Sequence, residues 1–202
     1  MNKTVFLTRV GLLSAVSFVL MYLNFPLPPF PPWLKIDFGD VPAMIATFSL
    51  GPVAGVLVQL MKNILYFFFK GTATAGVGSV ANFIAGVALV LPAGLIYRRY
   101  RSRNGALLGM SAGTLSLVVV MGVFNYYVLL PLFAAVMDLP IEAFVGMAAR
   151  TIPQITDLRT LVILGVTPYN LVKGLSVSLI TFLLYKHIAR IFKLHAGQNM
   201  IK

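Results

Sequence analysis

Two polar side chains, Asn170 and Lys173, interrupt the apolar stretch GVTPYNLVKG at residues 165–174. In a helix, positions three apart share a face, so an amide and an ammonium group would point the same way. Thr167 is expected to cap this helix and Pro168 to occupy its first turn, which places both groups within about two turns of its start. An ionisable group at the centre of a membrane helix costs at least ~2.5–3.5 kcal/mol, so Lys173 is a candidate functional residue.

Further polar groups interrupt the other apolar segments of the chain: Gln59, Lys62, Asn63, Asn82 and Asn125. Amides often do no more than hold membrane helices together, typically for under ~2 kcal/mol each, and for Asn63 and Asn82 both roles stay open. Lys62 has a second interpretation, in which its long side chain reaches out to the membrane surface.

The chain carries none of the common catalytic patterns. The stretch FFFKGT holds a lysine, a glycine and a threonine, but not in the order of a nucleotide-binding loop. There is no cysteine and no G-x-S-x-G turn, and the two histidines, His187 and His195, lie in the basic C-terminal stretch without metal-ligand spacing. We therefore predict no catalytic residue, no metal site and no cofactor.

The composition is that of a membrane protein. Of the 202 residues, 59% are hydrophobic and 10% are charged, whereas a soluble domain carries about 25% charged residues. Six apolar segments are predicted as membrane helices: 4–23, 41–50, 52–69, 77–97, 105–136 and 168–191. The second is too short to cross alone, the fifth is long enough to tilt, and the first is interpreted as a retained helix rather than a signal peptide. Residues 1–202 are expected to form one membrane-embedded domain.

The net charge of +11 is distributed as a membrane orientation signal rather than as a nucleic-acid surface. Basic residues gather around 3–9, 98–103 and 186–193, and all three groups face inside if the N-terminus does. All five acidic residues then fall in or near outer loops: Asp37, Asp40, Asp138, Glu142 and Asp157. We predict an all-α, six-helix membrane bundle with both termini inside and no nucleic-acid partner.

On this topology Asn125, Asn170 and Lys173 lie toward the outer side, among aromatic residues that include Phe38, Tyr126 and Tyr169. Apolar walls with a few placed polar groups are typical of a pocket for a small, flat, hydrogen-bonding molecule. Long loops at 24–37, 70–79 and 138–166 lie on the same side, and residues 141–150 are predicted to form an amphipathic helix at the membrane surface.

The first predicted helix carries a pattern of small residues. Gly11 and Ala15 are four apart, and Ser14 and Ser17 are interpreted as extending the same smooth surface. Small residues let helix backbones approach closely in lipid, either within one chain or against a partner's helix, and both interpretations stay open.

Four stretches are distinctive as an ordered set: FPPWLKIDFGDVPAMIATFSLGPVAGVLVQLMKNILYFFFKGT, GVGSVANFIAG, NYYVLLP and TPYNLVKG. Together, over nearly the whole chain, they resemble the riboflavin-specific S component of energy-coupling factor (ECF) transporters. The resemblance implies a multi-pass protein of the prokaryotic plasma membrane that binds riboflavin from outside. It also implies docking on a transmembrane coupling subunit that two cytoplasmic ATPases drive.

The resemblance also assigns residues. It implies that Asn125, Asn170 and Lys173 hydrogen-bond the flavin, and that residues 72–78, with Thr74 and Gly76, contact it through backbone groups. Phe38 is expected in the pocket wall, and Asp40 and Asn82 are candidates for the ribityl hydroxyls. The resemblance further implies that Gly11, Ser14 and Ala15 dock on the coupling subunit. Position 11 is glycine here, where alanine is usual in the family.

Several alternatives stay open at this point. FMN is a second candidate ligand, and an S component for thiamine, biotin or a pyrimidine is an alternative function. An autonomous secondary carrier and a membrane enzyme are alternatives from other classes. Residues 138–166 match no motif of the family, so no role is assigned to them.

Overall fold

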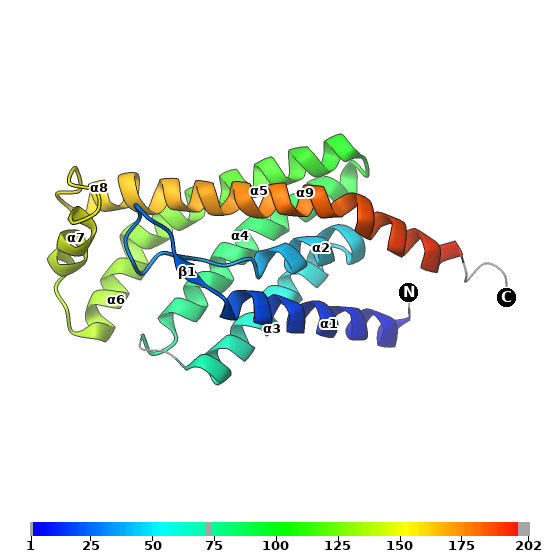
Figure 1. Cartoon of the computed structure of the whole chain (residues 1–202), viewed down its shortest axis with the longest axis horizontal. Coiled ribbons are helices and arrows are strands. Elements are labelled where there is room, and N and C mark those ends of the chain that lie inside the picture. The colour runs from blue at the N-terminus through cyan, green and yellow to red at the C-terminus, as the bar shows by residue number, and fades with distance from the viewer. Residues whose placement is uncertain (1, 72–73, 198–202) are drawn as a thin grey trace.

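The computed structural model describes residues 2–71 and 74–197, with side chains as far as Leu184. The chain is a bundle of long helices (Figure 1). They are α1 (Lys3–Tyr22), α2 (Asp40–Leu50), α3 (Pro52–Lys70), α4 (Val77–Arg99), α5 (Arg103–Phe124), α6 (Leu130–Met137), α7 (Ile141–Ala149), α8 (Leu158–Thr160) and α9 (Thr167–Gly197). Two π-helical turns, Asn125–Leu129 and Leu161–Val166, join α5 to α6 and α8 to α9. Strands β1 (Phe25–Pro26) and β2 (Lys35–Ile36) pair antiparallel within the first loop.

Five segments are long and apolar enough to cross a membrane: Lys3–Tyr22, Pro52–Lys70, Val77–Arg99, Arg103–Met137 and Leu158–Leu184. The all-α membrane class is thereby confirmed. The second predicted helix is indeed short, because α2 has 11 residues and ends at Gly51, whose φ of 107° opens the tight turn into Pro52. Large apolar side chains such as Leu7, Leu115 and Leu179 point outward, as expected where lipid is the solvent.

The helices pack around α2. α4 lies along α5 and α5 along α9, while α1 and α2 both pack on α3, and α2 also contacts α4 and α9. Ala43, Met44 and Ala46 of α2 are fully buried. The short helix is thus the centre of the bundle, and its first residue, Asp40, is enclosed by neighbouring helices.

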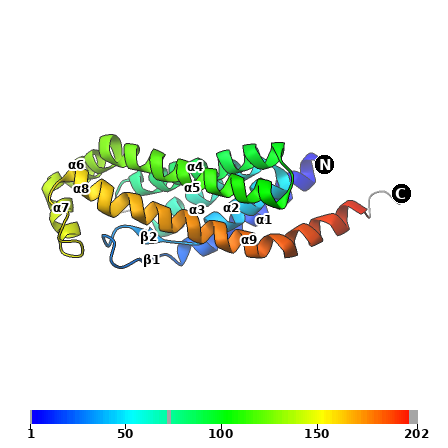
Figure 2. The same cartoon turned by 90° about the horizontal axis from the view of Figure 1, so that it is seen from above.

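The two ends of the molecule differ. The N-terminus and the C-terminal end of α9 lie at one end, with the turn between α4 and α5, whereas α7 and the loop carrying β1 and β2 lie at the other (Figures 1 and 2). Phe144 of α7 packs edge-on against Trp33 of that loop, with ring centroids 5.6 Å apart. The predicted helix at 141–150 is confirmed, and it closes this end of the bundle. The side chains of Lys186, His187, Arg190, Lys193 and His195 lie outside the described residues.

The predicted start of the last helix, at Thr167 and Pro168, is wrong. The helical segment begins at Leu158, where Asp157 accepts a hydrogen bond from the Thr160 N–H at 2.7 Å and forms a capping box. That hydrogen bond also lowers the pKa of the Asp157 carboxyl from its ordinary value. Thr167 has helical angles (φ −62°, ψ −55°), and the π turn directly before it accommodates Pro168 inside the helix.

Candidate ligand-binding site

Two acidic and two basic side chains meet inside the bundle. Lys173 Nζ lies 3.1 Å from Asp40 Oδ2 and 3.4 Å from Asp37 Oδ2. Lys62 Nζ donates a hydrogen bond to Asp40 Oδ1. Since all four side chains are buried, this charged cluster ties the first loop and α2 to α3 and to α9.

The cluster is electrically balanced, which is the condition for burying charge in a membrane protein. Its two carboxylates face two ammonium groups, so the formal charges cancel. Neutral donors take further acceptor positions: Gln59 Nε2 donates to Asp40 Oδ1 at 2.9 Å, and the Gly39 N–H donates to Asp37 Oδ1 at 2.9 Å. Removing any one charged partner would leave an uncompensated charge in the bundle.

Three buried asparagines from three helical segments repeat one arrangement. Asn63, Asn125 and Asn170 each donate Nδ2 to the backbone carbonyl four residues earlier, at 2.8 Å in every case. Each amide is fixed by its own helix, and its carbonyl oxygen is not engaged in that bond. For Asn63 that oxygen is buried without any hydrogen-bond partner. Asn63 Oδ1 is therefore placed to accept a hydrogen bond from another molecule.

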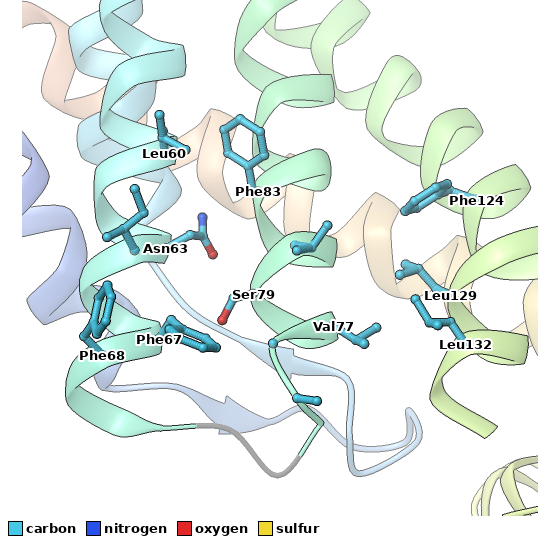
Figure 3. Close-up of a pocket in the computed structure, with 14 residues that line it drawn as sticks. Leu60, Asn63, Phe67, Phe68, Val77, Ser79, Phe83, Phe124, Leu129 and Leu132 are labelled. Atoms are coloured by element: carbon cyan, nitrogen blue, oxygen red, sulfur yellow. The ribbon is translucent and has the colours of Figure 1, made fainter. Parts of the chain in front are cut away.

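A pocket of about 460 Å³ opens between α3, α4 and the segment from α5 to α6 (Figure 3). Its walls are mostly apolar, with aromatic rings from Phe67, Phe83 and Phe124. Asn63 and Ser79 contribute its polar side chains. This volume is within the ~300–1,000 Å³ range of small-molecule sites. Helix α3 carries both Asn63 of the pocket wall and Lys62 of the charged cluster, but none of the four cluster residues lines the pocket, and neither Asn125 nor Asn170 does.

The structure places the predicted site residues in two groups. Asp40 and Lys173 belong to the charged cluster, and Phe38 packs beside it in the core. Gly76 lines the pocket directly before α4, with a φ of 88°. Of the predicted contact stretch 72–78, residues 72 and 73 lie outside the described residues. Thr74 Oγ1 accepts the N–H of Gly78 in the first turn of α4, and the buried Asn82 Oδ1 has no hydrogen-bond partner.

Several sequence-based interpretations need correction. Lys62 does not reach the membrane surface, because it is fully buried against Asp40. Asp37 lies at the end of the first loop and Asp40 at the start of α2, and both are buried counter-ions, a role that the sequence did not indicate. Of the two tyrosines expected near the site, Tyr126 is exposed and Tyr169 is buried. The Tyr169 hydroxyl donates a hydrogen bond to the Lys35 carbonyl.

The small-residue surface of α1 is also smaller than predicted. Gly11 and Ala15 face outward, whereas Ser14 and Ser17 are buried. Ser14 donates to the Val10 carbonyl of its own helix at 2.7 Å, and Ser17 donates to the Gly39 carbonyl. The two serines therefore face the bundle and lie off the surface that Gly11 and Ala15 share.

The predicted site omitted four buried polar residues: Asp37, Gln59, Lys62 and Asn63. A signal for three of them was present, because Gln59, Lys62 and Asn63 are three and four residues apart and share one face of α3. Asp37 carried no such signal, since its partner Lys173 is 136 positions away. No group of three His, Cys, Asp or Glu side chains able to hold a metal occurs within 2–71 and 74–184, where side chains are described.

Membrane-length helices around a balanced polar centre define an integral membrane protein with an internal polar site. The chain belongs to the family of ECF transporter substrate-specific components, whose model matches residues 5–185. It is 38% identical over 188 residues to the riboflavin transporter RibU of Staphylococcus aureus (strain TCH60), covering 93% of this chain and 92% of that protein. It is 37% identical over 180 residues to the riboflavin transporter FmnP of Bacillus subtilis (strain 168), covering 89% of each.

The fold is that of this family as well. A solved structure of the S component of a bacterial ECF transporter superposes with a TM-score of 0.76 at 35% identity, covering 95% of this chain and 99% of the other. The relatives are named as transporters and not as enzymes. The chain is therefore a multi-pass membrane protein of the bacterial plasma membrane.

Proposed function

We propose that the chain is the high-affinity riboflavin-binding subunit of an ATP-driven ECF vitamin importer and captures riboflavin from the extracellular side. The observation that carries this proposal is the apolar pocket, whose wall helix α3 also belongs to the buried, charge-balanced cluster. A flavin ring is flat and largely apolar, and its edge carries carbonyls, ring nitrogens and one N–H. Phenylalanine walls suit the ring body, while fixed amides and the Lys173 ammonium suit its edge.

The proposed ligand contacts keep the residues expected from the sequence. The ring would be hydrogen-bonded by Asn125, Asn170 and Lys173. It would also contact the backbone at Thr74 and Gly76, and Phe38 would form part of the apolar wall. Asp40 positions Lys173, and Asn82 offers an acceptor to the ribityl hydroxyls. FMN remains a second ligand to be tested beside riboflavin.

An ATP-driven importer would need partner subunits, because this sequence contains no nucleotide-binding loop pattern. We place the coupling-subunit contact on the outward face of α1, at Gly11 and Ala15. A Cβ at Gly11 would meet nothing within 4 Å, so a partner's helix has open access to the backbone there. The remaining partners are two cytoplasmic ATPases, as expected for an ECF module.

The proposed topology has six transmembrane segments with both termini inside. Both termini lie at one end of the bundle (Figure 1), which an even number of crossings requires. The extended loop and α2 together supply the crossing that α2 is too short to make alone. Residues 1–202 act as one membrane-embedded domain.

The test is to purify the chain alone in detergent, strip bound ligand and titrate riboflavin while following the quenching of flavin fluorescence. A tight, saturable quench supports the proposal, and binding weaker than micromolar overturns it. FMN, thiamine, biotin and a pyrimidine are titrated in parallel, and tighter binding of one of the last three reassigns the vitamin. Uptake into liposomes without any ATPase would reassign the chain as an autonomous carrier.

A further inference from the structure

We propose that Asn63 is a ligand-binding residue whose side-chain oxygen accepts a hydrogen bond from a donor on the bound flavin. This inference rests on the proposed function and adds a recognition residue on α3. A flavin carries two kinds of donor, the ring N–H and the ribityl hydroxyls, and either satisfies the same acceptor.

The first argument is the position of Asn63. Its side chain is 4% exposed, lines the pocket and points from α3 toward α4, between the levels of Phe83 and Phe67 (Figure 3). Leu60, Ile64 and Phe67 flank it on the same wall. The amide is thus a polar group in the middle of an apolar wall.

The second argument is the state of the amide. Asn63 Nδ2 is held at 2.8 Å by the Gln59 carbonyl, which fixes the side chain and directs its oxygen away from its own helix. That oxygen has no partner, although it is buried. A buried acceptor without a donor costs free energy, and a hydrogen bond from a bound ligand would remove that cost.

The third argument is that the nearest polar groups of α3 are already engaged. The Lys62 ammonium donates to Asp40, and Gln59 Nε2 donates to the same carboxylate. Gln59 is held in place by Gly86, because a Cβ there would lie 2.2 Å from its carboxamide. Ser79 of α4, the other polar side chain of the pocket, does not donate to Asn63 Oδ1, which has no partner. A molecule that fills the pocket can therefore supply the missing donor.

The test compares Asn63→Leu with the wild type on riboflavin, N3-methylriboflavin and lumiflavin. N3-methylriboflavin lacks the ring N–H, and lumiflavin lacks the ribityl hydroxyls. We expect Asn63→Leu to lose about tenfold to a hundredfold in riboflavin affinity. If Asn63 accepts from one particular flavin donor, the variant and the wild type should bind the analogue that lacks this donor with equal affinity. The analogue that gives equal affinities therefore identifies the donor.

A general folding defect is separated from this result, because it would weaken all three ligands alike. Asn63→Ala, with a smaller side chain, replaces Asn63→Leu if the leucine variant does not fold. Thr114→Val is the matched control: it removes a buried polar contact to Ser178 (3.3 Å) between α5 and α9 and should leave all three affinities unchanged.

Unchanged riboflavin affinity in the Asn63 variants, or equal losses of affinity for all three ligands, would overturn the inference. The pocket would then be interpreted as a groove for a lipid chain. Failure of the wild type to bind any flavin would overturn the proposed function itself.

Discussion

The ammonium of Lys173 lies 3.1 Å from one carboxylate oxygen of Asp40, and the other oxygen of Asp40 accepts from Lys62. One carboxylate thus joins a lysine of α9 to a lysine of α3. Lys173 also faces Asp37, at the end of the first loop. The proposed ligand-binding lysine is therefore also a structural counter-ion, and its two roles predict separable effects.

Lys173→Met should weaken riboflavin binding about tenfold to a hundredfold, because it removes a donor from a dry site. It should also lower the free energy of unfolding by about 3–5 kcal/mol, because Asp37 loses its cation. Fluorescence titration and thermal unfolding in detergent measure the two effects.

Lys62→Met is the matched control for that experiment. It breaks a buried ion pair of the same kind and should lower stability comparably. It should cost less affinity, because the proposed function assigns a ligand contact to Lys173 and none to Lys62. Equal affinity losses in the two variants would mean that Lys173 acts only through the fold.

The sequence predicted the long helices well, because their boundaries follow apolar runs that end in glycine, proline or charge. It mispredicted the start of the last helix, where Thr167 and Pro168 have the residue types of an N-terminus. Tertiary packing and a π turn override that local signal, and Asp157 provides the actual cap. As a result, Asn170 and Lys173 lie deep in the helix rather than near its start.

The site was predicted only in part, for a different reason. Single polar residues in apolar segments are visible in the sequence, and Asn125, Asn170 and Lys173 were recognised in that way. Pairing is not visible: Asp40 and Lys62 are 22 positions apart, and Asp37 and Lys173 are 136 apart. Hydropathy therefore indicated buried lysines without showing which acids neutralise them.

Gly86→Ala should destabilise the protein by about 1–3 kcal/mol. The new methyl group would lie 2.2 Å from the Gln59 carboxamide, which must then move and release Asp40. Thermal unfolding measures the loss. Gly146→Ala on α7 is the control, because its methyl group meets nothing within 4 Å and should be neutral or stabilising. Equal unfolding temperatures for the two variants would contradict a packing role for Gly86.

Gly11→Leu should abolish riboflavin uptake and leave riboflavin binding by the purified chain unchanged. The leucine side chain would project from the outward face of α1 and hold a partner's helix away from the backbone. Growth of riboflavin-requiring cells that express the chain with its coupling module measures uptake. Gly146→Leu, also at an open helical position, should preserve both properties. Normal growth with Gly11→Leu would assign this face of α1 to lipid.

Aromatic contacts hold the first loop against the start of α9 and against α7. Phe30 packs edge-on against Tyr169, with centroids 5.8 Å apart, and the Tyr169 hydroxyl donates to the Lys35 carbonyl. Trp33 packs at 88° against Phe144 of α7. The same loop ends at Asp37, which contacts Lys173. Opening the loop would therefore move Asp37 and disturb the proposed binding lysine.

Trp33→Ala should speed riboflavin release about two- to tenfold, since an aromatic pair of this geometry contributes ~0.5–1.5 kcal/mol beyond its buried area. Stopped-flow recovery of flavin fluorescence during a chase measures release. Phe144→Ala should have a similar effect, and the double variant should be no faster than either single variant, because both remove one contact. Phe69→Ala removes an aromatic pair with Phe18 away from this loop and should leave release unchanged. Additive effects of Trp33→Ala and Phe144→Ala would show that the two rings act on release independently, and that their contact does not hold the loop closed.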